Sequence, residues 1–122
     1  MKSFTYAPDA PYGRHLSQAF DRHGIAEQLK AKTKPNALAR VPEVLAAGEV
    51  ELAIAGIPTL LSVKGVQIVG PLPGELQSAF VNTAGVSAAA KEPDAAKALI
   101  KYLATPEAAA VIKAKGMEPV AR

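Results

Sequence analysis

Apolar residues in the first quarter of the chain change from strand-like to helix-like spacing. Residues 4–7, Phe-Thr-Tyr-Ala, are β-prone and stop at a proline-rich stretch, which predicts a short strand followed by a loop. Apolar side chains then recur at helical spacing, so we expect a helix from about residue 11 or 13 to Arg22, ended by Gly24 in the left-handed position. Residues 25–31 fit one more short turn of helix.

The same alternation continues to residue 69. A helix is expected at about 38–47, with Pro42 tolerated in its first turn and Gly48 closing it. Residues 50–55 predict a strand, 56–58 a turn, and 66–69 a third strand. Strands that alternate with helices predict an α/β fold: a mixed, mainly parallel sheet flanked by helices.

The last third of the chain differs in its pattern. Gly70-Pro71-Leu72-Pro73 interrupts two apolar runs, and the weak alternation of residues 76–90 predicts a long strand that bends at Gly85. Two Ala-rich helices come next, at about 93–103 and 106–115, each with proline in its first position. Thr105 is expected to cap the second of them, and Gly116 to end it.

Composition excludes several classes of protein. The chain has 122 residues, 49% of them hydrophobic and only 5% aromatic, which suits one compact domain packed from small and branched side chains. The net charge of +3 comes from Lys and Arg spread along the chain, so no nucleic-acid partner is expected. Cysteine is absent, which excludes disulfides and thiolate metal sites. No run approaches the roughly 20 apolar residues of a membrane span.

The order of these segments resembles the second half of a type II periplasmic solute-binding protein of the molybdate-binding-like group, which serves ABC transporters. The resemblance covers nearly the whole chain and rests on the following runs: Phe4-Thr5-Tyr6, Gly24-Ile25-Ala26, Ala47-Gly48-Glu49-Val50-Glu51-Leu52-Ala53, Val66-Gln67-Ile68-Val69-Gly70-Pro71-Leu72-Pro73, Glu92-Pro93-Asp94-Ala95-Ala96, Thr105-Pro106-Glu107-Ala108-Ala109 and Lys115-Gly116-Met117-Glu118-Pro119. It implies that residues 1–72 form the second lobe. The hinge-like Gly70-Pro71-Leu72-Pro73 would lead out of it, and residues 73–122 would be the hinge crossing, the returning strand and the C-terminal helices of an incomplete first lobe.

The resemblance also implies partners and a location. The family captures a small solute between two lobes and delivers it to a membrane permease in the periplasm. No signal peptide is recognisable at Met1, so the chain as written is expected to stay in the cytoplasm. If the first lobe is incomplete, apolar residues of the last two helices lose packing surface. We therefore expect a homodimer formed through the C-terminal tail, by tail exchange or tail-to-tail packing.

In related proteins the loop after the first strand presents backbone N–H groups to an anion, as a helix N-terminus does by geometry. Here that loop offers Asp9, Ala10, Tyr12 and Gly13, with Arg14 opening the helix. It contains no Ser or Thr, which argues against a tetrahedral oxyanion. Two alternatives remain open: Asp9 as an ordinary helix cap, and Arg14 as a solvated surface group.

Two further loops are candidates for the same site. Ligands in open α/β sheets gather beyond the carboxyl ends of strands. Gly56 allows close backbone approach there, and Thr59 offers a hydroxyl, although a tight turn that starts a short helix explains both equally well. Arg40 is the only strong anion donor of the loop at 36–40. His23, just before Gly24, is expected to favour the C-terminal end of its helix.

The sequence offers no catalytic pattern. It lacks a nucleophile elbow, a phosphate loop, a dinucleotide fingerprint and a zinc motif, so we expect no enzyme, no cofactor and no metal. The function predicted is solute binding, with a small and anionic solute. The alternatives are a self-associating interaction module without a specific ligand, and a fragment or truncated gene product.

Overall fold

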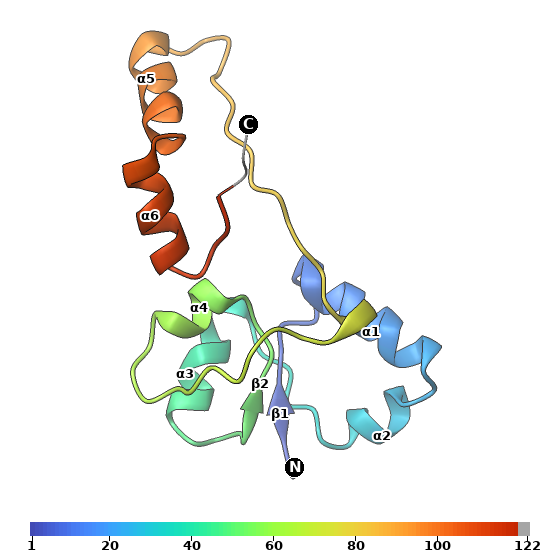
Figure 1. Cartoon of the computed structure of the whole chain (residues 1–122). Helices are drawn as coiled ribbons and strands as arrows, with labels where there is room; N and C mark the ends of the chain where they lie inside the picture. The colour runs from blue at the N-terminus through green and yellow to red at the C-terminus, as the bar shows by residue number, and fades with distance from the viewer. Residues whose placement is uncertain (120–122) are drawn as a thin grey trace. The chain divides into compact units, whose positions relative to one another are not determined.

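A computed structural model describes residues 1–119 of the chain. Its contacts divide it into two compact units, residues 1–79 and the residues from Phe80 onward. The first unit carries the sheet (Figure 1), and it contains most of the buried residues. The second unit carries a pair of helices.

Strand β1 (Phe4–Thr5) is the centre of the first unit. It pairs in parallel with β2 (Leu52–Ala53), with Phe4 opposite Leu52 and Thr5 opposite Ala53. On its other edge Phe4 bridges to Thr33, and the N–H of Lys34 donates to the carbonyl of Phe4 at 2.9 Å. Parallel strands need a crossover connection, which the helices between them provide. The α/β class predicted from the sequence is confirmed.

The helices of the first unit follow the expected order closely. They are α1 (Pro11–Arg22), α2 (Ala26–Lys30), the 3₁₀ turn η1 (Leu38–Arg40), α3 (Val41–Ala46), α4 (Ile57–Leu61) and the 3₁₀ turn η2 (Gly74–Leu76). Gly24 and Gly48 follow α1 and α3 with φ of 66° and 74°, the left-handed conformation that ends a helix and that glycine adopts without strain. Both glycine stops were predicted.

The main core of the first unit is aromatic. Phe4, Tyr6, Leu16 and Phe20 are buried together, and Phe20 meets the rings of Phe4 and Tyr6 edge-on, with centroids 6.5 and 6.2 Å apart. Edge-to-face pairs of this kind add to the free energy gained from burial alone. The core fixes the α1 face that lies on β1.

Two expected strands are not formed. Residues 66–69 and 77–87 lie outside helix and strand, with Val69 91% and Val81 71% exposed. Both runs carry strand-forming residues, but a strand gains stability only from a hydrogen-bonded neighbour and a buried face. The described residues give these runs neither, so the predictions for 66–69 and 76–90 were wrong. The strand predicted at 50–55 is present as its two central residues.

The second unit contains α5 (Pro93–Leu103) and α6 (Pro106–Ala114), which pack on each other. Both begin with proline, as predicted. The hydroxyl of Thr105 accepts a hydrogen bond from the N–H of Ala108 at 3.3 Å and so caps α6. Among the helices within residues 1–119, none has the length and apolar character of a membrane span.

Candidate functional site

Three loops of the first unit are held together by one small apolar cluster. Ala7, Ala10 and Val41 are buried in it, and Tyr12, Ala53 and Ala55 pack against them. These residues come from the loop after β1, from the end of β2 and from the start of α3. Since β1 and β2 are parallel, their carboxyl ends lie at the same edge of the sheet, where open α/β sheets bind ligands. The cluster therefore fixes the predicted site loops at one edge.

The start of α1 is shaped by a close approach to β1. A Cβ placed on Gly13 would lie 1.9 Å from the carbonyl oxygen of Ala7, so only glycine fits there. The N–H of Ala7 donates to the phenol of Tyr12 at 3.0 Å, which ties the strand end to the first turn of the helix. From the sequence we expected Gly13 to belong to the loop whose backbone N–H groups meet an anion. A glycine three residues into a proline-led helix was the signal for close packing.

Burial also affects the Tyr12 phenol. Its pKa is raised above the ordinary value, chiefly because burial disfavours the phenolate; the N–H of Ala7 acts in the opposite direction, and the charge of Tyr6 adds to the rise. Tyr12 is therefore a neutral phenol over the physiological range. It serves here as a hydrogen-bond acceptor for the backbone.

The two polar residues around the helix start form a local contact. The residue that caps α1 is Ala10, in extended conformation and without a side-chain cap, so the alternative of Asp9 as a helix cap is wrong. Instead the guanidinium of Arg14 donates to the carbonyl oxygen of Asp9 at 2.6 Å. Both residues are at the surface. The first N–H groups of α1 have no partner within the helix and no side-chain cap; Tyr12 is partly exposed, whereas Gly13 is buried against Ala7.

The second loop begins at Gly56, which precedes α4. The N–H of Thr59 donates to the carbonyl of Gly56 at 3.0 Å, the local geometry of a turn that starts a short helix. A Cβ on Gly56 would make ordinary contacts of 3.7 and 3.8 Å, so no steric need for glycine exists here. Arg40 lies at the end of η1, with its Nε 3.7 Å from a carboxylate oxygen of Glu43. The roles of Gly56, Thr59 and Arg40 toward a ligand stay predictions.

A hollow of about 540 Å³ lies elsewhere in the first unit, between α1, α2 and residues 33–35. The residues around it include Tyr6, Phe20, Asp21 and Leu29, and none of the predicted ligand-binding residues lines it. Within residues 1–119 no three His, Asp or Glu side chains are grouped as metal ligands. The candidate site is thus an open edge of loops.

A parallel α/β unit with loops gathered at the carboxyl edge of its strands has the arrangement in which open α/β sheets bind ligands. The chain belongs to the family of bacterial extracellular solute-binding proteins, whose model matches residues 4–118. This confirms the resemblance found in the sequence.

Two characterised relatives cover most of the chain. It is 32% identical over 113 residues to aconitate isomerase of a Pseudomonas species and 31% identical over 112 residues to the molybdate-binding protein ModA of Azotobacter vinelandii. These alignments take in 92% and 88% of this chain but only 43% and 44% of the relatives. The chain therefore spans less than half the length of these relatives. No solved structure matches it.

Proposed function

We propose that this chain binds a small anionic solute at the loops that follow β1 and β2, as part of the solute-binding component of an ABC-type uptake system. The observation that carries the proposal is the shared cluster of Ala7, Ala10 and Val41, because it brings all three predicted loops to one edge of the sheet. Family membership supports the binding role. A membrane permease is the partner that this role requires.

The start of α1 supplies the main attraction for an anion. The N–H of Tyr12 stands at the positive end of a helix of 12 residues, and the buried Gly13 lets this end of the helix lie close to β1. Arg14 is held at this helix end through its bond to Asp9, with further N–H donors of its guanidinium available. Gly56 and Thr59 would contact the ligand from the second loop, and Arg40 from the third.

A carboxylate fits this edge better than a tetrahedral oxyanion. Residues 8–14 contain no hydroxyl of Ser or Thr, whereas an arginine can hold a carboxylate through two parallel hydrogen bonds. One relative is named for aconitate, a carboxylate, and the other for molybdate, an oxyanion. We therefore expect aconitate or a similar polycarboxylate to bind more tightly than molybdate or sulfate.

Thermal unfolding of the chain with aconitate, citrate, molybdate and sulfate tests the proposal. A ligand at one hundred times its dissociation constant stabilises the folded state by about 2.7 kcal/mol, which is a rise of several degrees in Tm. Arg14→Gln should reduce the shift. Lys30→Gln removes the same charge from α2, away from the loops, and serves as the control. If no anion in the panel raises Tm, the proposal is wrong.

An enzymatic role is the second candidate, because one relative is named aconitate isomerase. Moving a double bond in a carboxylate requires a base to take a proton and an acid to return one. The described loops offer no paired acid and base, so we propose binding without catalysis. Incubation with one isomer of aconitate, followed by chromatography, should show no second isomer. Its appearance at a rate proportional to protein concentration would overturn this part of the proposal.

A further inference from the structure

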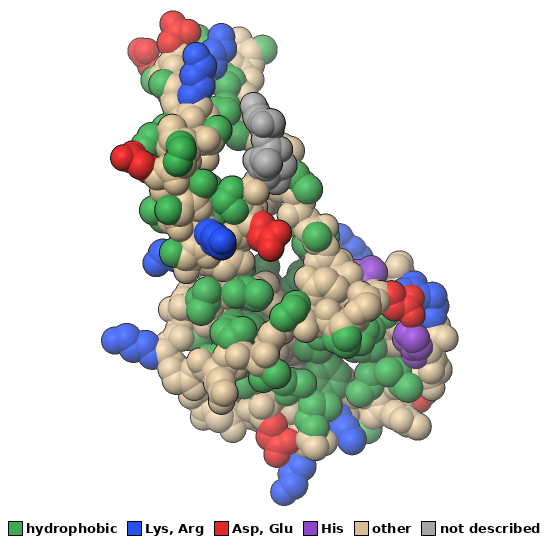
Figure 2. All heavy atoms as spheres, viewed as in Figure 1, with side chains coloured by type: hydrophobic (Ala, Val, Ile, Leu, Met, Phe, Trp, Pro, Cys, Tyr) green, Lys and Arg blue, Asp and Glu red, His purple; other side chains and the backbone are tan. Residues whose placement is uncertain are grey.

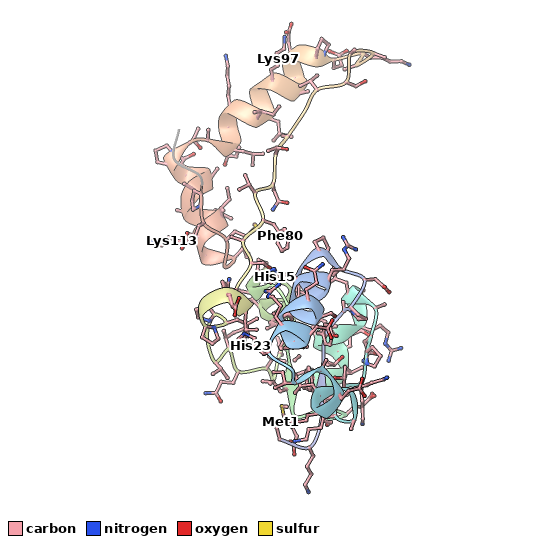
Figure 3. The ribbon with its side chains drawn as sticks, turned by 90° about the vertical axis from the view of Figure 1, so that its right-hand side faces the viewer. Met1, His15, His23, Phe80, Lys97 and Lys113 are labelled. Atoms are coloured by element: carbon pink, nitrogen blue, oxygen red, sulfur yellow. The ribbon has the colours of Figure 1, made fainter. Side chains whose placement is uncertain are left out.

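Three side chains from α1 and its C-terminal cap converge on one residue of the η2 turn. The imidazole of His23 lies 2.6 Å from one carboxylate oxygen of Glu75, and the guanidinium of Arg22 lies 3.6 Å from the other. The imidazole of His15 makes a 2.6 Å hydrogen bond with the carbonyl oxygen of Glu75. Figure 3 labels both histidines beside this turn. We call this group of contacts the Glu75 clasp.

The hydrogen bonds of the Glu75 clasp can form whether the two imidazoles are neutral or protonated. A carbonyl oxygen only accepts hydrogen bonds, so Nε2 of His15 must carry its proton, and the same holds for Nε2 of His23 against the carboxylate. A neutral imidazole can bear its proton at Nε2, and an imidazolium always does. Protonation of His23 adds an ionic attraction to Glu75. The groups that face the Glu75 carboxylate are Arg22, the last residue of α1, and His23, its cap.

Apolar contacts support the clasp from the core. Leu72 and Leu76, on either side of Glu75, pack against the core of Phe4, Tyr6, Leu16 and Phe20. The turn between them is closed by its own bonds. The N–H of Leu72 donates to the side chain of Gln77 at 3.0 Å, and the N–H of Gln77 to the carbonyl of Gly74 at 3.2 Å. Gly74 begins the turn at φ 54°.

The segment that this arrangement fixes is the one expected to be the hinge. Residues 70–73, Gly-Pro-Leu-Pro, lead into it, and the residues after Gln77 have no regular structure and expose Phe80 and Val81. The two prolines restrict their own backbone, and the clasp holds the turn at 74–77. The first residues free of these contacts are those beyond Gln77.

We propose that the Glu75 clasp moves the pivot between the two units from the Gly70–Pro73 segment to the residues after Gln77. Residues 70–77 then move with the first unit, and the linker begins only beyond them. The two units are joined through residues whose freedom is set by α1, the helix that also carries the candidate anion site. This inference is independent of whether the chain binds a solute.

Backbone ¹⁵N relaxation and amide hydrogen exchange along residues 70–87 of the full chain test the pivot. In the unaltered protein, order should stay high through Gln77 and fall after it. Glu75→Ala combined with His15→Leu removes all three contacts. The amides of Leu72, Leu76 and Gln77 should then exchange roughly two- to fivefold faster, the range that partly exposed charged contacts support. High salt should reproduce part of the change.

A matched control separates the clasp from a general loss of charge. Glu27→Ala removes a carboxylate from α2, where it lies 4.0 Å from Lys30, and should leave residues 70–77 unchanged. The α1 amides should keep their exchange rates in every variant, which shows that the unit stays folded. The inference is overturned if order already falls at Gly70 in the unaltered chain, or if the double variant leaves the three amides within the error of the measurement.

Discussion

Single residues decide how the candidate site is built. Two neighbouring residues at the start of α1 contact Ala7, just after β1. Gly13 can lie against the carbonyl of Ala7 because it has no side chain, and the phenol of Tyr12 accepts a hydrogen bond from the N–H of Ala7. The sequence identified both positions as ligand-binding candidates from their place in the loop. It could not reveal the contact with Ala7, because that depends on how closely helix and strand approach in space.

Replacing Gly13 with alanine should destabilise the first unit strongly. The new Cβ would overlap the carbonyl of Ala7 and lie 2.8 Å from the Cα of Pro8, both backbone atoms that cannot turn aside. We expect a loss of about 2–4 kcal/mol in the free energy of unfolding, measured with urea. Gly56→Ala is the control, since its Cβ meets only ordinary contacts, and it should change stability by no more than about 0.5–1 kcal/mol. Equal effects of the two changes would contradict the close approach.

Tyr12 should make stability depend on alkaline pH. Burial raises its pKa in the folded state, so the neutral phenol contributes stability that is fully present below about pH 10, the ordinary value for tyrosine. This contribution is lost as the pH rises through the folded-state pKa. Urea unfolding at a series of pH values should show the decline in the free energy of unfolding, and Tyr12→Phe should flatten it.

Tyr12→Phe should also lower the free energy of unfolding by about 1–3 kcal/mol at neutral pH, because the N–H of Ala7 loses its acceptor. Tyr102→Phe, at an exposed position, should do neither.

Helices and strands differ in how well the sequence predicts them. The bounds of α1, α5 and α6 agree with expectation within a residue or two, because proline, glycine and the cap of Thr105 are local signals that act inside the helix itself. The strands expected at 66–69 and 76–90 are absent from the described residues. Their sequences carry the right residues, but a strand is completed by a neighbour from elsewhere in the chain.

The cap of α6 can be tested by itself. Thr105→Ala removes the acceptor of the Ala108 N–H and should destabilise the start of α6 by about 1 kcal/mol. Amide exchange at residues 107–109 is the measurement, and a several-fold increase is expected there. Thr83→Ala, in the irregular segment, is the control and should leave these amides unchanged. If exchange at Ala108 does not change, the hydroxyl does not cap the helix in solution.

At the scale of the whole molecule, the exposed apolar residues of the second unit predict self-association. Leu99 is 59%, Leu103 46% and Val111 60% exposed, and Figure 2 shows hydrophobic side chains over the surface of α5 and α6. Complete burial of a large aliphatic side chain contributes about 1.5–3 kcal/mol, and a second copy could recover part of this at each half-exposed position. The homodimer stays a prediction, and the family match favours solute binding over a purely structural module.

Light scattering at several protein concentrations tests the dimer. We expect the apparent mass to rise toward twice that of the chain at micromolar concentration. Leu99→Gln combined with Val111→Gln should shift the protein to monomer, whereas Lys97→Gln on α5 should not. A folded monomer across the concentration range would contradict the prediction.

The division of the chain into a second lobe (residues 1–72) and an incomplete first lobe (residues 73–122) also stays a prediction. Leu72 and Leu76, on either side of that boundary, pack on the same core.

The sequence by itself determined the α/β class, the helices, the glycine stops and the family, because these depend on short-range signals and on the order of segments. It also put the candidate site loops after the two strands. Only the tertiary structure decided which apolar runs became strands, why Gly13 must be glycine, and that His15, Arg22 and His23 meet at Glu75. Each of these depends on residues far apart in the chain or on how closely two elements pack, and the spacing of residues along a sequence carries no record of which atoms will come within a few ångströms.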